Sequence, residues 1–208
     1  MASIAKYSNN NHDIDRILAH HERSLRNNSN KDIDSERFCE NKRLHPQRGI
    51  SDKAYYYSLI DDCYVYGRAD VKTMGEIIVT APKELDKSRE DEFFRAVYGA
   101  LNEFCAGEKY CVSARVHGDE SGAAHLHYDF VPAVPDRNPK HPHDHKVCMT
   151  EVLSKKKYYE LHSYLQAKAG DPFGVNLHSR VTKAQGGNRT VRELKRERTM
   201  LRQRGRAR

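Results

Sequence analysis

Three histidines and two carboxylates stand close together in residues 117–127 of this chain of 208 residues. His125 and His127 are two residues apart, and successive side chains of a β-strand point to opposite faces. Both imidazoles would therefore project from one face of a strand, with Leu126 directed to the other face, toward the core. Imidazole nitrogens are common ligands of divalent metals of the Mn, Co, Ni and Zn class, so this pair indicates a metal site.

A third histidine, His117, ends a predicted strand at 110–117. The loop GDESGAA after it is rich in turn-forming residues and predicts a hairpin with a second strand at 125–134, which would carry His117 next to the pair. Three protein ligands leave coordination positions open for water or a phosphate oxygen, as catalysis requires. Asp119 or Glu120 would serve as a fourth ligand or orient a histidine. The alternative is that the histidines only decorate the surface of a sheet.

Hydrophobic periodicity predicts the elements that must hold this hairpin in place. Amphipathic patterns predict helices, and an apolar run that ends at a proline predicts a further strand: helices at 13–26, 52–66, 83–106 and 150–169, and a strand at 76–82. Thr150 is the predicted N-cap of the last of these helices, and Thr190 that of a strongly basic helix after a connection at 171–187. The pattern favours an α+β fold in which helices cover one face of an antiparallel sheet.

The composition is that of a globular protein that is not embedded in a membrane. Hydrophobic residues make up 38% and charged residues 31%, and no apolar run reaches the length of a membrane span or of a signal-peptide core. The five cysteines are odd in number and form no Cys-x-x-Cys pair. This usage is typical of a reduced protein of the cytoplasm rather than of a disulfide scaffold or a zinc ribbon.

Positive charge is concentrated at the C-terminal end. Residues 180–208 contain eleven Lys/Arg and two Asp/Glu, a net charge of +9, whereas residues 1–179 carry 25 against 27, a net charge of −2. A basic segment binds the phosphate backbone of nucleic acids without reading their sequence. We therefore predict DNA contacts from cations of this tail, namely Arg189, Arg192, Lys195 and Arg196. The alternative is a solvated tail with no ligand.

Other side chains that carry chemistry have more than one interpretation. Tyrosine is the alternative nucleophile of strand-transfer nucleases, although tyrosines more often pack or stack on bases; the candidates are Tyr55, Tyr56, Tyr57, Tyr158 and Tyr159. Arg23, Arg37 and Arg68 would clamp phosphate as bidentate donors or be ordinary surface charges. Asp32 would bond an active-site group or stabilise a turn. The run HPHDH at 141–145 is typical of an exposed loop, with metal binding as the alternative.

Four segments of the chain occur in the order found in one known family. They are HHERSLRNNSNKDIDSERFCENKRL at 20–44, EIIVTAPKEL at 76–85, VHGDESGAAHLHYDFVP at 116–132 and NRTVRELK at 188–195. In these segments the chain resembles the MobV relaxases, the plasmid mobilisation or Pre plasmid recombination enzymes of the HUH endonuclease superfamily. The resemblance implies a five-stranded antiparallel sheet with helices packed on it. It also implies a catalytic domain at 1–187, followed by a basic helix or tail at 188–208.

An active site is implied by the same resemblance. A divalent metal would be held by the three histidines of the hairpin with Glu120 nearby, Mn²⁺ foremost and Mg²⁺, Co²⁺, Ni²⁺ or Zn²⁺ as alternatives. The family's nucleophile is a histidine at the position of His20, and we place Glu120 and Arg23 with it in the catalytic set. His21 is adjacent and chemically equal, so residue chemistry alone does not separate the two.

The predicted function is therefore that of a relaxase. Such an enzyme nicks one strand at a plasmid origin of transfer, forms a covalent 5′-phosphate adduct through a histidine, and religates the strand after transfer. Its partners would be single-stranded or hairpin origin DNA, together with mobilisation or coupling proteins. Two alternatives remain open: a rolling-circle replication initiator with a tyrosine nucleophile, and a non-catalytic DNA-binding protein that uses the basic tail.

Overall fold

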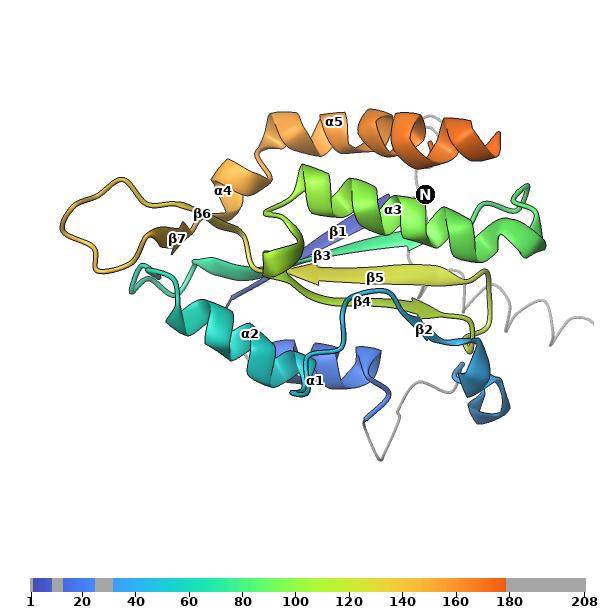
Figure 1. The fold of residues 1–208 in the computed structure, drawn as a ribbon, viewed down its shortest axis with the longest axis horizontal. Coiled ribbons are helices and arrows are strands. Elements are labelled where there is room, and N and C mark those ends of the chain that lie inside the picture. The colour runs from blue at the N-terminus through green and yellow to red at the C-terminus, as the bar shows by residue number, and fades with distance from the viewer. Residues whose placement is uncertain (1, 9–12, 25–31, 179–208) are drawn as a thin grey trace, which may run out of the picture. The chain divides into compact units, whose positions relative to one another are not determined.

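A five-stranded antiparallel sheet forms the centre of the molecule, in the computed structural model, which describes residues 2–8, 13–24 and 32–178 (Figure 1). Its strands lie in the order β1 (Ala2–Ser8), β3 (Lys72–Thr80), β5 (His125–Phe130), β4 (Cys111–His117) and β2 (Lys42–Arg43). Every neighbouring pair is antiparallel. The predicted α+β fold and the predicted hairpin are thus confirmed.

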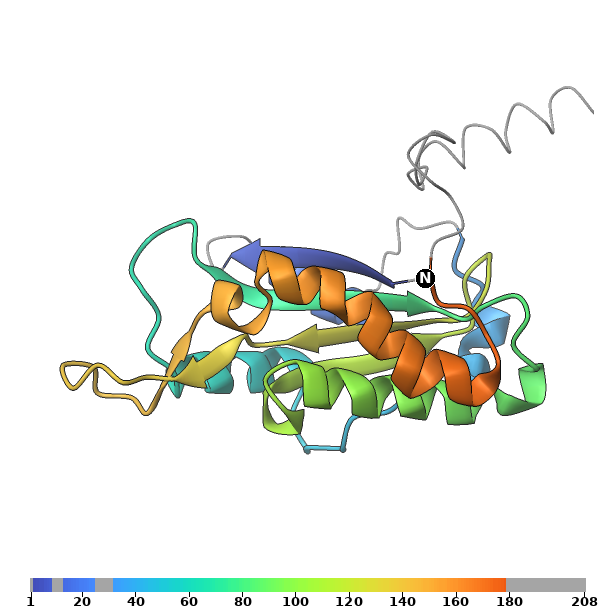
Figure 2. The same ribbon diagram turned by 90° about the horizontal axis from the view of Figure 1, so that it is seen from above.

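Helices cover both faces of this sheet (Figure 1). One face carries α3 (Glu90–Phe104) and α5 (Lys155–Leu165), which lie side by side over it in Figure 2. The other face carries α1 (Asp13–His21) and α2 (Asp52–Asp61). The prediction that helices cover only one face of the sheet is therefore wrong. The reason is that each helix pair has an apolar stripe of its own to bury, and a sheet offers two faces.

Two hydrophobic clusters correspond to the two faces. On the α3 side, alternate strand residues such as Ile77, Leu126 and Tyr128 are fully buried in the larger cluster. Leu126 therefore points into the core, as the His-x-His spacing predicts. On the α1 side, helix residues such as Ile14 and Leu18 build a smaller cluster beside the polar face of the strands. That polar face is where the functional side chains stand.

The bounds of several predicted elements change in the structure. The helix predicted at 13–26 ends at His21, and the one at 52–66 ends at Asp61. The helix predicted at 83–106 begins only after a 3-10 turn at Lys87–Arg89. The strand predicted at 125–134 is split: β5 ends at Phe130, and β6 (Ala133–Pro135) pairs with β7 (His145–Val147) in a separate two-stranded sheet.

Helix capping differs from the prediction at residues 149–170. The segment is divided into α4 (Met149–Val152) and α5, and a π-helical turn at Gln166–Gly170 follows. Ser154 caps α5, because its side chain accepts the backbone N–H of Lys157, so the predicted cap at Thr150 is wrong. Leu153 leaves the helical conformation between the two helices, where it is buried in the core.

Shorter elements complete the described chain. They are 3-10 helices at Ser35–Glu40, Glu108–Tyr110 and Asp171–Phe173. Among the described helices, none has both the length and the apolar character that crossing a membrane requires. The compact unit that holds the sheet ends at Leu177. The predicted domain boundary at 187, the helix after Thr190 and the basic tail lie outside the described residues.

Candidate metal centre and active site

The pairing register of three strands brings the functional side chains onto one face. Thr80 of β3 is opposite His125 of β5, which in turn is opposite His117 of β4. Two residues further along β5, His127 lies between Ile78 and Arg115. Because antiparallel partners share a face, all three histidines converge, as the hairpin prediction requires.

The ring nitrogens of these histidines are arranged as metal ligands are. One nitrogen from each of His117, His125 and His127 lies within 4.8 Å of the others. For two of the three, the second ring nitrogen is hydrogen-bonded outside the cluster: His117 Nε2 lies 3.1 Å from the His21 carbonyl oxygen, and His127 Nδ1 lies 2.7 Å from Glu76 Oε1. In both cases the imidazole donates to oxygen, which directs the lone pair of the other nitrogen into the cluster.

The two nitrogens directed into the cluster have no hydrogen-bond partner. His117 Nδ1 and His127 Nε2 are buried and unpartnered among the described residues. Buried polar atoms almost always find a partner, and two neighbouring exceptions need an explanation. A divalent cation accepts both lone pairs and so removes the free-energy cost of leaving these buried nitrogens without a partner. The donor set of three imidazoles with a carboxylate nearby therefore fits the metal that the sequence predicts.

Burial keeps the two deepest ligands uncharged. It lowers the pKa of His117 to about 2, and the nearby His127 imidazole, were it protonated, and the Arg23 guanidinium act in the same direction. It also lowers the pKa of His127 to about 3, helped by the charge of His21 and opposed by Glu76. Since a metal ion binds only the neutral imidazole, this environment leaves both side chains ready for a cation at neutral pH.

Glu120 is the carboxylate that faces the cluster. Its Oε1 lies 4.0 Å from His117 Nδ1 and 3.5 Å from His20 Nε2, and its Oε2 lies 3.8 Å from His125 Nε2. Burial raises its pKa, but the hydrogen bonds from His20 and Arg23 and the charge of His125 outweigh this and hold the pKa well below its usual range. Glu120 is therefore an ionised carboxylate beside the three imidazoles.

Asp119, the other predicted fourth ligand, is occupied differently. Its carboxylate is fully buried and accepts hydrogen bonds from Arg23 Nε at 2.9 Å and from Asn41 Nδ2 at 2.8 Å. Arg23 has a left-handed backbone with φ of 56°, which is unfavourable for a residue with a Cβ. The bidentate pair with Asp119 holds this conformation and places the guanidinium against Glu120 and His20.

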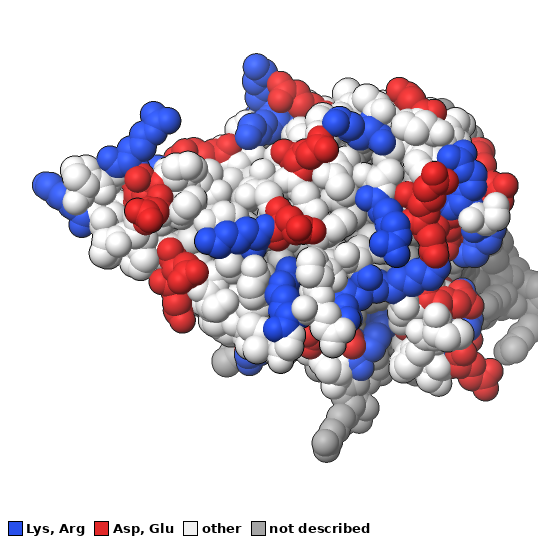
Figure 3. Space-filling view, viewed as in Figure 1, with Lys and Arg blue, Asp and Glu red and all other residues white. Residues whose placement is uncertain are grey.

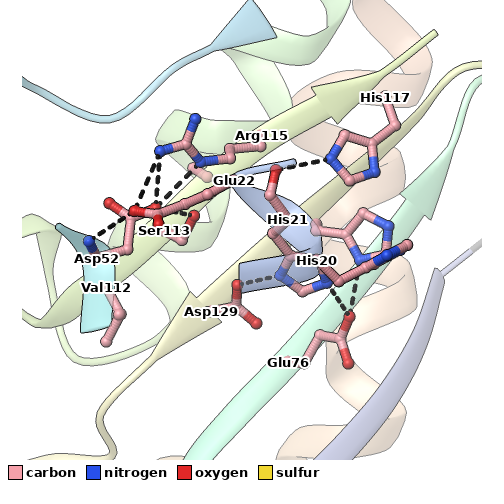
Figure 4. Close-up of polar contacts among 12 residues, drawn as sticks. His20, His21, Glu22, Asp52, Glu76, Val112, Ser113, Arg115, His117 and Asp129 are labelled. Carbon is pink, nitrogen blue, oxygen red and sulfur yellow. Dashed lines mark hydrogen bonds and ion pairs between the residues drawn. The ribbon is translucent and has the colours of Figure 1, made fainter. Parts of the chain in front are cut away.

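The two adjacent histidines at the end of α1 have different environments (Figure 4). His20 is partly exposed, at 27% of its side chain, and its Nε2 lies 3.2 Å from an Arg23 nitrogen. His21 is buried with both ring nitrogens engaged, at 2.7 Å from Asp129 Oδ2 and at 3.3 Å from Glu76 Oε1. His20 is thus the one that a substrate can reach.

Carboxylates determine the charge of His21. Burial lowers its pKa, but the charge and hydrogen bond of Asp129, together with Glu76, raise it further, to about 9. His21 is therefore an imidazolium clamped between two carboxylates, and its ring packs on His127 with the centroids 4.1 Å apart. It fastens the end of α1 to the sheet beneath the cluster.

A known protein family shares the sequence pattern of this chain. The chain matches the Mob_Pre family, plasmid recombination enzyme, over residues 1–196. The chain belongs to this family. Among curated proteins, none matches the chain significantly.

Solved structures of a Mob_Pre relaxase domain share the fold. One is the MobM relaxase domain (MOBV; Mob_Pre), Mn-bound at pH 6.8 on plasmid pMV158 oriT DNA of 22 nucleotides with a 3′-thiophosphate. Its sequence is 25% identical to this chain, and the TM-score is 0.71 over 95% of this chain and 97% of that chain. A Mn-bound crystal structure at pH 4.6 on 22-nucleotide oriT DNA is 24% identical, with a TM-score of 0.70 over 94% and 98%. A complex with 26-nucleotide oriT DNA is 21% identical, with a TM-score of 0.58 over 93% and 98%.

Sequence reasoning about this Mob_Pre chain missed the residues that support the ligands. Glu76 orients His127 and accepts a hydrogen bond from the Tyr7 hydroxyl at 2.6 Å. A glutamate at the start of the apolar run EIIVTAP was a signal, since a buried carboxylate needs partners. Asp129 stands two residues after His127 and therefore shares its face of the strand. Asn41, whose Oδ1 accepts the Gly118 N–H at 2.9 Å, lies in the family segment at 20–44, but no role was predicted for it.

Glu76→Gln should weaken Mn²⁺ binding about 10- to 100-fold, the usual effect of losing a partner behind a ligand. Glutamine can still accept from His127, but it removes the negative charge that Glu76 shares between His127 and His21. Isothermal titration calorimetry with Mn²⁺ measures the affinity. Glu92→Gln, on the exposed side of α3, is the matched control. Equal affinities in the two variants would contradict the assigned role.

The tyrosines that were candidate nucleophiles are engaged elsewhere. The hydroxyls of Tyr55, Tyr56 and Tyr57 donate to the Lys109 carbonyl, to Thr73 Oγ1 and to Asp15 Oδ1, respectively. Tyr158 and Tyr159 are carried by α5, on the face of the sheet opposite the histidines. Within the described chain, none of these five hydroxyls contacts the histidine cluster.

The remaining candidates have the following places. His141 pairs with Asp136 at 2.5 Å and stacks on Tyr64, so the 141–145 run is a structured loop, and it supplies none of the metal-ligand groups found among the described residues. Arg37 pairs with Glu40, and Arg68 with Asp70, both at the surface. DNA contacts by these two arginines stay predictions. Asp32 offers its carbonyl to the Ser121 N–H, next to Glu120.

Proposed function

We propose that this chain is a Mn²⁺-dependent relaxase that nicks one strand at a plasmid origin of transfer and stays bonded to the 5′ end through His20. The observation that carries the proposal is the pair of unpartnered, buried imidazole nitrogens with an accessible histidine beside them. Membership of the Mob_Pre family supports it, as does the MobM relaxase domain, which is Mn-bound and DNA-bound in the same fold. The activity on plasmid DNA would take place in the cytoplasm.

His117, His125 and His127 would hold the metal, with the Glu120 carboxylate nearby. A divalent cation there draws charge from a phosphate oxygen and so makes the phosphodiester a better electrophile. Mn²⁺ is favoured because the MobM domain binds it, whereas three imidazoles by themselves would suit Ni²⁺ or Zn²⁺ as well. Mg²⁺, Co²⁺, Ni²⁺ and Zn²⁺ are the alternatives that metal titration would separate.

His20 would supply the nucleophile. A lone pair of its neutral ring attacks phosphorus, the new bond is N–P, and the bond to the 3′-oxygen breaks. The proton lost from the imidazole balances the one gained by the 3′-hydroxyl. Arg23, 3.0 Å from Glu120 and 3.2 Å from His20, would hold the ring in line and stay close to the phosphate charge. Because the phosphoramidate keeps the bond energy, the same site can religate the strand.

Incubation of the full chain with oligonucleotides that span the origin of its own replicon tests the proposal. A covalent protein–DNA adduct should form with Mn²⁺ and fail to form with a chelator, as seen on denaturing gels. The absence of any adduct on single-stranded origin DNA with Mn²⁺ would favour a non-catalytic DNA-binding protein.

The basic tail would add affinity without sequence preference. Removal of residues 190–208, which hold Arg192, Lys195 and Arg196, should weaken binding to unrelated DNA sequences alike and flatten its salt dependence, because roughly one counterion is released per neutralised phosphate. Anisotropy titrations over a range of salt concentrations measure the slope. An unchanged slope would count against this role and would favour a tail that packs onto the domain or binds a protein partner, such as a mobilisation or coupling protein.

A further inference from the structure

Two adjoining hollows open beside the metal cluster. The first, of about 330 Å³, is lined by the end of α1, the segment 38–43 and the cluster residue His117. The second, of about 280 Å³, continues along residues 47–52. Both are lined by Glu22, Arg43 and Arg115, so they form one continuous surface, which we call the β2 groove.

The β2 groove is positively charged within a domain that is not. Two carboxylates line it, those of Glu22 and Asp52, against five cations, namely Arg23, Lys42, Arg43, Arg48 and Arg115. Arg23, Lys42 and Arg115 are each paired with a carboxylate, so the positive charge that stays open in the groove is that of Arg43 and Arg48. Over the face of the molecule that Figure 3 presents, Lys and Arg side chains alternate with Asp and Glu. A charge excess confined to a groove concentrates anions there.

Two of these arginines keep their charge available. Arg43 donates to the amide oxygen of Gln47 at 2.8 Å, and Arg48 donates to main-chain carbonyls of β4 at 2.7 Å. Within the ranges that the structure describes, neither forms an ion pair with a carboxylate. Arg115, in contrast, is paired with Asp52 at 2.9 Å (Figure 4), and Lys42 is paired with Asp91. Arg43 and Arg48 are thus the cations that a phosphate backbone would meet.

Exposed apolar side chains accompany these charges. Phe38 lines the first hollow at 42% exposure, and Ile50 lines the second at 53%. Isolated exposed apolar side chains are common on protein surfaces, so it is their place in a groove with unpaired guanidinium groups, not their exposure alone, that points to a ligand. A flat aromatic ring beside a guanidinium is the pairing that single-stranded DNA uses, because each base stacks on the ring while its phosphate meets the cation.

We propose that the β2 groove binds the single-stranded DNA that adjoins the scissile phosphate, with one base stacked on Phe38 and the following phosphate on Arg43. This inference rests on the proposed function, since the first hollow shares His117 and Arg23 with the active site. A strand that leaves the metal cluster enters the groove directly. Phe38 and Arg43 therefore position the substrate on one side of the cleavage point.

Binding of fluorescein-labelled (dT)12 to the full chain, measured by anisotropy with a chelator present, tests the proposal. Phe38→Ala should weaken binding about tenfold, as expected for the loss of one stacked base, and Phe38→Trp should restore it. Arg43→Ala should weaken binding and reduce the salt slope by about 0.7. Tyr159→Ala, an aromatic residue at 66% exposure, and Arg95→Ala, on the outer side of α3, are matched controls that should bind as wild type.

Photocrosslinking of an oligonucleotide that carries 5-iodouracil locates the contact. The crosslink should map to the peptide that contains Phe38. Wild-type affinity in both groove variants, or a crosslink only to other peptides, would overturn the proposal. Neither assay needs metal or cleavage, so a chain that binds through the groove but never forms an adduct would refute the proposed function and leave the groove in place.

Discussion

His20→Ala should abolish the covalent adduct with origin DNA, by about a thousandfold or more, while Mn²⁺ still binds. The variant removes the only accessible imidazole of the pair at the end of α1 and leaves His117, His125 and His127 untouched. A phosphoramidate breaks down in mild acid, because protonation of its nitrogen makes imidazole a good leaving group. The wild-type adduct should therefore survive alkali and be lost in acid.

Mass spectrometry of the adduct peptide decides between the nucleophiles. An adduct that resists acid and maps to a tyrosine would contradict the histidine mechanism and favour a replication initiator. His21→Ala is not a neutral control, since it leaves Asp129 and Glu76 buried without their cation, at a cost of roughly 3–5 kcal/mol of stability. Tyr57→Phe, on the exposed side of α2, is the better control and should form the adduct normally.

His127→Ala should eliminate metal-dependent nicking, with a loss of roughly a thousandfold or more, because it removes one of the two proposed ligands whose ring nitrogens are buried without a hydrogen-bond partner. Mn²⁺ affinity should fall further than the about 10- to 100-fold typical of losing a supporting partner. DNA binding should largely persist, since phosphate contacts do not depend on this side chain. Calorimetry measures the metal, and gel assays measure the nick.

A histidine outside the cluster provides the matched control. His143→Ala changes the 141–145 loop, where a second group of histidines could capture metal in an affinity assay. It should leave both Mn²⁺ affinity and nicking at the wild-type level. Circular dichroism shows whether His127→Ala still folds. Full cleavage activity in a folded His127→Ala protein would rule out the assigned metal centre.

The two predicted losses differ in a way that separates the roles of the side chains. His20→Ala should keep metal binding and lose the adduct, whereas His127→Ala should lose both. Glu120 lies between the two groups, within 3.5 Å of His20 and 4.0 Å of His117, so it belongs to both. The proposed nucleophile and the proposed metal ligands are thus linked by one carboxylate and one arginine.

Local periodicity was enough to predict the hairpin of β4 and β5 that carries the three histidines. Side chains two apart on a strand share a face whatever the rest of the chain does, so His125, His127 and the buried Leu126 followed from their spacing. The turn-forming loop after His117 set the strand pairing, and the register opposes His117 to His125 directly. Periodicity also found the bodies of the main helices, because each carries its own apolar stripe.

Predictions failed where distant contacts decide the outcome. Thr150 has the chemistry of a cap, yet burial of Leu153 breaks the helix and leaves Ser154 to cap the longer part. Amphipathic patterns cannot say to which face of a sheet a helix packs, so the two-sided cover was not foreseen.

Tertiary structure alone assigned the partners. Local spacing was enough to show which histidines converge, but His21 and Asp129 are 108 residues apart, Arg23 and Asp119 are 96 apart, and His127 and Glu76 are 51 apart. Strand order and the path of α1 bring these pairs together, and no local repeat encodes them. Two chemically equal histidines therefore have different environments only because α1 packs against the sheet. This packing buries His21 between carboxylates and leaves His20 exposed beside the cluster.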